Sequence, residues 1–223
     1  MASKLWWLIH KDLMIEYRTR QTWTSMLLLC VIIAVVFSLQ VKLPMEHRTA
    51  TVSTMLWLAI IFASQVVVER TGIAEHQDGC WDALTQYPVS ASTIYLAKLI
   101  VNLVAILALN CVMVPLFVVL TDVPLLLHAG AMSLVIGLGS LSVAAIGTLV
   151  SAATFGQRQR GAVLSLLALP LVLPVLLSAS EATRLAATND LGNQWWRWVQ
   201  FLGAFTIVFV TLGIVLFGAM IEE

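Results

Sequence analysis

Long continuous runs of apolar residues, separated by short polar segments, make up most of the chain. A helix needs about 20 apolar residues to cross roughly 30 Å of hydrocarbon. Six segments approach or exceed that length, namely 22–41, 52–68, 93–120, 127–154, 162–179 and 199–221. Because the runs do not alternate, they are unlike the strands of a membrane barrel. The pattern predicts an all-α integral membrane protein with six transmembrane helices, in which residues 1–223 form a single transmembrane domain.

Residues 3–20, before the first span, have a different pattern. Apolar and aromatic side chains recur at helical spacing on one face. They are Trp6, Ile9, Leu13 and Tyr17. The basic residues on the opposite side are Lys4, Lys11 and Arg18. We therefore expect an N-terminal amphipathic helix in the inner interface, acting either as a simple anchor or as the elbow helix that precedes the first span in many exporter permeases.

The placement of Lys and Arg predicts the orientation of the chain in the membrane. With a cytoplasmic N-terminus, eight basic residues lie inside and four outside. The inner set is Lys4, Lys11, Arg18, Arg20, Arg70, Lys98, Arg158 and Arg160. The outer set is Lys42, Arg48, Arg184 and Arg197. Six spans with this bias predict that both termini are cytoplasmic.

Composition narrows the class of protein further. Of 223 residues, 60% are hydrophobic and 11% are charged, and twelve Lys and Arg balance twelve Asp and Glu. Soluble domains carry about 25% charged residues, so the composition excludes a soluble enzyme, a disordered tail and a disulfide-stapled secreted module. It also argues against a nucleic-acid binder, because there is no basic surplus to neutralise phosphates.

The polar segment 69–88, between the second and third spans, has the features of a docking element. A short helix here would place three acids along one side, at i, i+3 and i+7. They are Glu75, Asp78 and Asp82. Trp81 and Leu84 add apolar anchors, and Pro88 ends the segment because the residue before a proline disfavours helix. Such a helix suits docking into a partner's groove; the alternative is a solvated loop that joins two spans.

The next cytoplasmic loop, residues 155–161, is short and basic, with Arg158 and Arg160. The span that follows contains Pro170 and Pro174. Each proline removes an N–H and clashes with a preceding carbonyl, so two prolines four residues apart predict a broken helix. It is interpreted either as a static bend or as a hinge that moves during transport.

These cytoplasmic segments and the first parts of the spans that follow them contain two groups of motif residues. The first comprises Glu69-Arg70, Asp78-Gly79, Leu84, Pro88 and Leu96-Ala97-Lys98. The second comprises Arg160-Gly161, Val163-Leu164-Ser165, Leu169-Pro170-Leu171 and Pro174. Together they resemble the haem exporter protein B family, the membrane permease subunit of the ABC transporter used in cytochrome c maturation. Cys80-Trp81 and Tyr87 depart from the family pattern and indicate a divergent branch.

The resemblance implies a division of labour in the bacterial cytoplasmic (inner) membrane. It implies docking to an ATPase partner, protein A, and association with a haem-handling membrane subunit, protein C, and a small single-span subunit, protein D. The complex would use ATP to free a haem-loaded chaperone, protein E, and two copies of the permease are expected by analogy with other exporters. The expected ATPase-coupling residues are Glu69, Arg70, Glu75, Asp78, Gly79, Trp81, Asp82, Leu84, Arg158 and Arg160.

No Gly-x-x-x-x-Gly-Lys-Ser/Thr motif occurs in the sequence, so we expect a partner to hydrolyse ATP and this chain to be non-catalytic. No cofactor or metal site is expected on the chain itself, and haem is expected to be handled by the complex. Two alternatives remain open. The chain is an exporter permease for a lipid, a drug or a polysaccharide, or it is a membrane scaffold that conducts nothing.

Other residues are candidates for a smaller role. His47 and His128 fall at or near the outer side, where either could ligate haem, although an interfacial histidine is the ordinary case. An aromatic belt at the outer interface is the expected role of Trp195, Trp196 and Trp198. Close helix packing is expected along a small-residue stripe of Gly137, Ser140, Ala144, Gly147 and Ser151. Interhelical hydrogen bonds, or less commonly a polar path, are expected of Gln65, Asn102 and Asn110.

Overall fold

Five long helices form the described part of the protein. The computed structural model describes residues 9–10, 28, 31–36, 45–77, 90–153 and 160–221. The helices are α3 (Met45–Gln77), α5 (Ala91–Thr121), α6 (Ala129–Ala153), α7 (Arg160–Ala187) and α8 (Asn193–Ile221). Each contains an apolar stretch of 21 to 31 residues, long enough to cross a membrane. The all-α, multi-pass architecture is thus confirmed for five of the six predicted spans.

The N-terminal part of the chain contributes few described residues. Residues 31–36 are helical and fall in the predicted first span, and Ala34 is buried in the core. Ile9 and His10 fall in the predicted amphipathic helix; both are helical, Ile9 packs against α5 and His10 is exposed. The remainder of these two elements lies outside the described residues, so the amphipathic helix and the six-span count stay predictions.

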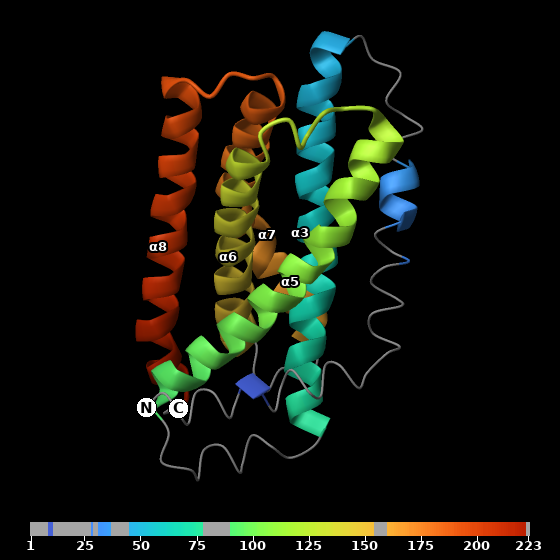
Figure 1. Ribbon diagram of the computed structural model, residues 1–223. Helices are drawn as coiled ribbons and strands as arrows, with labels where there is room; N and C mark the ends of the chain where they lie inside the picture. Colours follow the sequence, from blue (N-terminus) through green and yellow to red (C-terminus); the bar gives the residue numbers. More distant parts are fainter. Residues whose placement is uncertain are drawn as a thin grey trace.

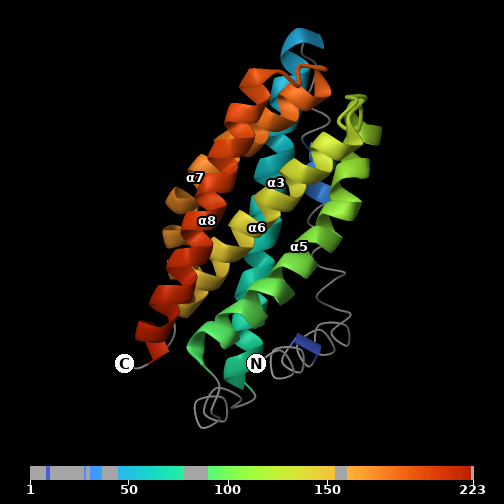
Figure 2. The same cartoon turned by 60° about the vertical axis from the view of Figure 1, so that its left-hand side comes forward.

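The five helices form an antiparallel bundle around α6, which packs against α3, α5, α7 and α8. Figure 1 shows α3, α6, α7 and α8 standing roughly upright while α5 crosses them diagonally. The turned view in Figure 2 shows α5 along one side of the bundle and α7 and α8 along the other. The starts of α3, α6 and α8 lie at one end with the ends of α5 and α7 (Figure 1). We call this the predicted outer end, and the opposite end, with Gln77 and Arg160, the predicted inner end.

Small residues allow α6 to occupy the centre of the bundle. Of the predicted stripe, Ser140, Ala144, Gly147 and Ser151 are buried, whereas nothing lies within 4 Å of a Cβ built on Gly137. Among the glycines of α6 the closest approach is made by Gly139, which the predicted stripe omitted. A Cβ on Gly139 would collide with the indole ring of Trp57 on α3, so only glycine lets these two helices come this close.

The helix ends differ from the sequence prediction on either side of the turn between α7 and α8, and α3 extends beyond the predicted span 52–68 at both ends. The span predicted to stop at residue 179 continues as α7 to Ala187, and the span predicted to start at residue 199 begins as α8 at Asn193. The turn after α7 explains the late stop. Asn189 adopts a left-handed conformation with φ of 61°, and the amide of Asp190 donates to the carbonyl of Leu185 at 2.9 Å. This is the arrangement of a Schellman motif, which Asn tolerates better than most residues.

The two prolines do not break α7. The predicted interruption is wrong, because the helix is continuous from Arg160 to Ala187 with Pro170 and Pro174 inside it. Membrane helices tolerate proline where neighbouring groups compensate for the lost backbone hydrogen bond. The carbonyl that loses its amide partner to Pro174 is that of Pro170, four residues earlier. The hydroxyl of Ser178 donates to the carbonyl of Pro174 at 2.7 Å, one turn beyond it. The role of the two prolines as a hinge stays a prediction.

Candidate functional site

The first predicted coupling segment begins as a direct extension of α3. The apolar span of α3 ends at Val68, but the helix itself continues to Gln77, so Glu69, Arg70 and Glu75 belong to its last turns. At about 1.5 Å per residue, residues 69–77 carry the helix about 13 Å beyond the span. The remaining predicted residues of this segment lie outside the described part of the chain. They are Asp78, Gly79, Trp81, Asp82 and Leu84.

The second predicted coupling segment borders the same end of the bundle. Arg158 lies outside the described residues, whereas Arg160 is the first residue of α7. The end of α3 and the start of α7 both lie at the predicted inner end (Figure 1). The structure therefore brings the borders of the two segments to one face of the molecule, as a shared partner would require.

The helices that carry these segments are paired with each other. α3 packs against α7, and the indole Nε1–H of Trp57 donates to the hydroxyl of Thr183 at 2.9 Å. Both side chains are fully buried. The ring of Trp57 also occupies the space that a Cβ on Gly139 would take. This one side chain therefore contacts α6 and α7 from α3, toward the predicted outer end. The sequence gives one signal of this role, a tryptophan inside an apolar span, but no sign of its partners.

Hydrogen bonds between polar side chains connect α6 to its other neighbours. Asn102 donates to Thr148 at 3.0 Å, and Asn110 donates to Ser140 at 2.8 Å, which joins α5 to α6 at two levels. The hydroxyls of Ser142 and Thr206 lie 2.6 Å apart and join α6 to α8. Interhelical bonding was the expected role of the two asparagines and is confirmed. The third expected residue, Gln65, is buried, and its Oε1 has no hydrogen-bond partner within the described residues.

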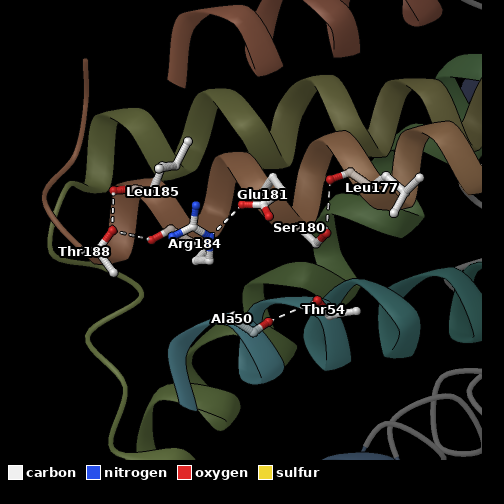
Figure 3. Close-up of polar contacts among 8 residues, drawn as sticks. All are labelled: Ala50, Thr54, Leu177, Ser180, Glu181, Arg184, Leu185 and Thr188. Atoms are coloured by element: carbon white, nitrogen blue, oxygen red, sulfur yellow. Dashed lines mark hydrogen bonds and ion pairs between the residues drawn. The ribbon is translucent and has the colours of Figure 1, made fainter. Parts of the chain in front are cut away.

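The predicted outer end carries most of the described charges. Figure 3 shows the last turns of α7 beside the first turns of α3. Glu181 accepts from the Nε of Arg184 at 2.6 Å, and this ion pair between successive turns of α7 lets the helix continue past two charges. On α3, Arg48 is half-buried, and its Nε is shielded from solvent without an acceptor in the described part of the chain. Of the four basic residues assigned to the outside, Arg48, Arg184 and Arg197 thus lie at one end, as the topology predicts, and Lys42 lies outside the described residues.

The two candidate histidines have different surroundings. His47 is exposed in the first turn of α3. His128 is half-buried immediately before α6, and its Nδ1 lies 3.2 Å from the carbonyl oxygen of Ala186 in the last turn of α7. The described residues contain no group of three or more His, Cys, Asp or Glu that could hold a metal ion.

The tryptophan cluster divides into buried and exposed members. Trp195 is 5% exposed and belongs to the core, whereas Trp196 is 51% exposed; their rings meet edge-on with centroids 5.0 Å apart. Trp198 is partly buried and begins an aromatic ladder that continues along α8 through Phe201, Phe205 and Phe209. Trp196 therefore fits the predicted aromatic belt, and Trp195 is a core residue that anchors the first turn of α8.

Comparison with known proteins agrees with this architecture. The family described as CcmB protein matches residues 3–223. The chain is similar to heme exporter protein B of Rhodobacter capsulatus, with 31% identity over 136 residues. That alignment spans 60% of this chain and 62% of the relative, so it covers about three-fifths of the relative's length.

Proposed function

The chain belongs to the CcmB protein family, and from this premise we propose that it is the permease subunit of an ABC transporter for haem export in cytochrome c maturation. The observation that carries the proposal is the family match over residues 3–223, on a bundle whose described helices include five candidate membrane spans. The absence of a phosphate-binding Gly-Lys motif from the sequence supports a non-catalytic subunit. A partner ATPase then supplies the energy.

The proposed contact with the ATPase is made at the predicted inner end by residues 69–88 and 155–161. The extension of α3 supports this assignment, because residues 69–77 carry the helix about 13 Å beyond the apolar span. An arm of this length suits a partner that docks on the cytoplasmic side. The membrane is then the bacterial inner membrane, with both termini in the cytoplasm.

The pairing of α3 and α7 suggests how a push at the inner end travels. Movement of the ATPase displaces the inner ends of both helices, since each carries one contact segment. The bond between Trp57 and Thr183 holds the two helices together toward the opposite end. The linked parts of α3 and α7 therefore tilt together against α6, and α7 bends at Pro170 and Pro174.

The expected partners follow from the same proposal. They are an ATPase (protein A), a haem-handling membrane subunit (protein C), a small single-span subunit (protein D) and, through the complex, a haem chaperone (protein E), with two permease copies per complex. ATP is bound by the partner and haem is handled by the complex. On this proposal the chain transmits work and contributes part of the membrane path.

Reversing the acids of the coupling segment tests the ATPase contact. We expect the triple variant Glu75→Lys, Asp78→Lys, Asp82→Lys to lose co-purification of the ATPase and stimulation of ATP hydrolysis. The matched control is Asp190→Lys, an exposed acid at the opposite end of the bundle. Equal ATPase recovery with the triple variant and with wild type would contradict this contact, provided that the triple variant inserts and elutes normally.

A further inference from the structure

His128 makes one hydrogen bond through its backbone carbonyl and one through its ring, and the second orients the imidazole. Its backbone carbonyl accepts from the amide of Met132 at 2.9 Å, which is the first hydrogen bond of α6. Its ring Nδ1 lies 3.2 Å from the carbonyl oxygen of Ala186. Because a carbonyl only accepts, Nδ1 carries the proton of this hydrogen bond. The lone pair of the neutral ring is therefore on Nε2, and no hydrogen bond to Nε2 is found in the described part of the chain.

This arrangement is typical of a metal-ligating histidine. Such histidines usually donate the other ring N–H to a carbonyl or carboxylate, which fixes the tautomer and the ring orientation. The exposed His47, at the same end of the bundle, makes no ring hydrogen bond that would orient it within the described residues. The two histidines therefore form a natural pair for comparison.

The surroundings of His128 exclude a bare metal ion held by the described residues. Zinc and similar ions need three or four protein ligands, and the described residues contain no such group. A single histidine suffices when the metal brings its own macrocycle, because the four porphyrin nitrogens leave an axial position for one protein ligand, as in the globins.

The neighbouring surface suits an apolar, planar group. Leu126 and Leu127, directly before His128, are 46% and 54% exposed. Gly130, in the first turn of α6, is exposed and has nothing within 4 Å of the position of a Cβ. Two exposed leucines and an exposed glycine next to an oriented imidazole offer apolar contact, space and a ligand.

We propose that Nε2 of His128 is an axial ligand for the iron of haem at the predicted outer end of the bundle. The inference rests on the proposed function for its cargo, but it assigns to this chain a direct haem contact. Haem binds there during transfer, with Ala186 as the carbonyl that positions the ring. The bond is a coordinate bond from the Nε2 lone pair to iron, with no change of oxidation state and no proton released.

The test is titration of the full-length chain, in lipid nanodiscs, with ferric haem and then with haem reduced by dithionite. We expect a saturable Soret shift at one haem per chain and, in the ferrous form, an iron–histidine stretching band in the resonance Raman spectrum. His128→Ala should lower the affinity about tenfold or more and abolish that band. His128→Gln provides a second variant, because its amide can still donate to Ala186 but does not replace imidazole as a ligand.

Two controls make the outcomes distinct. His47→Ala should bind haem as wild type does, and empty nanodiscs should show only unsaturable partition into lipid. Added imidazole should restore saturable binding at one haem per chain to His128→Ala, whereas in empty nanodiscs it changes only the spectrum of partitioned haem. Equal affinity and an unchanged Raman band in His128→Ala, or partition alone in wild type, would overturn the inference. Neither result touches the proposed ATPase contact, which is measured separately by co-purification with the wild-type chain.

Discussion

The contact between Gly139 and Trp57 makes a sharp prediction about stability. In Gly139→Ala the new Cβ would lie 2.6 Å from Cζ3 and 3.2 Å from Cζ2 of the indole, with Cη2 closer still. The indole is fully buried and fixed by its hydrogen bond to Thr183, so it can yield only by breaking that bond or by separating α3 from α6. A methyl group that is harmless on most helices should therefore be costly here.

The magnitude follows from two costs and one gain. Overpacking costs about 1–3 kcal/mol, and leaving the buried indole N–H without its acceptor costs about 1–3 kcal/mol more. Replacing glycine by alanine within a helix returns about 1 kcal/mol. We expect a net loss of about 3 kcal/mol, within a range of about 1–5 kcal/mol. At about 2–4 °C per kcal/mol for a chain of this size, the central value lowers the Tm by about 6–12 °C. The assay is thermal unfolding of the detergent-solubilised protein, followed by the monodisperse fraction in size-exclusion chromatography.

The chain supplies its own control for this experiment. Gly137→Ala lies on the same helix, two residues away, with nothing within 4 Å of its Cβ, so its Tm should be unchanged or slightly higher. Trp57→Phe removes the ring atoms that meet the new methyl group, so Gly139→Ala should cost little in that background. The reasoning is refuted if Gly139→Ala melts with the wild-type protein, or if its cost is the same with and without Trp57→Phe.

Three further predictions concern other contacts of the bundle. Thr183→Val should leave the indole N–H of Trp57 buried and unpaired, and should lower stability by about 1–3 kcal/mol in the same thermal assay, whereas Thr183→Ser should be closer to wild type. Asn110→Ala removes one α5–α6 hydrogen bond and should lower the free energy of unfolding by about 1 kcal/mol, since such bonds within membranes are individually modest. An unchanged stability would show that this hydrogen bond does not stabilise the bundle. The double variant Pro170→Ala, Pro174→Ala should raise the Tm by restoring two backbone hydrogen bonds. If the prolines form a hinge, the double variant should also lower the yield of holocytochrome c in cells. A full yield would refute the hinge.

The positions of the described spans could be predicted well from the sequence, because apolar runs of membrane length have few other outcomes. The span predicted at 93–120 is α5, Ala91–Thr121, and the span predicted at 127–154 is α6, Ala129–Ala153. The predicted ends of the spans were wrong where polar residues continue the helix. Glu181 and Arg184 neutralise each other within α7, and the tryptophans before residue 199 form the first turns of α8.

The contacts of the site were harder to predict than the spans. Small residues on α6 predict close packing, but which glycine meets an indole depends on the register between α3 and α6, which no local pattern encodes. The partner of Trp57 lies 126 residues away, and the carbonyl that orients His128 lies 58 residues away. Asn102 and Asn110 predict an interhelical hydrogen bond, because a side-chain amide inside an apolar span needs a partner. The sequence does not identify that partner.

Purification of the tagged chain from native membranes, with mass spectrometry of what co-elutes, tests the central claim most directly. The account predicts an ATPase subunit with a phosphate-binding Gly-Lys motif and a haem-handling membrane subunit in the same monodisperse complex. Recovery of the intact, folded chain with neither subunit, under conditions that preserve other ABC transporters of the same membrane, would contradict the assignment of this protein as a permease driven by a partner.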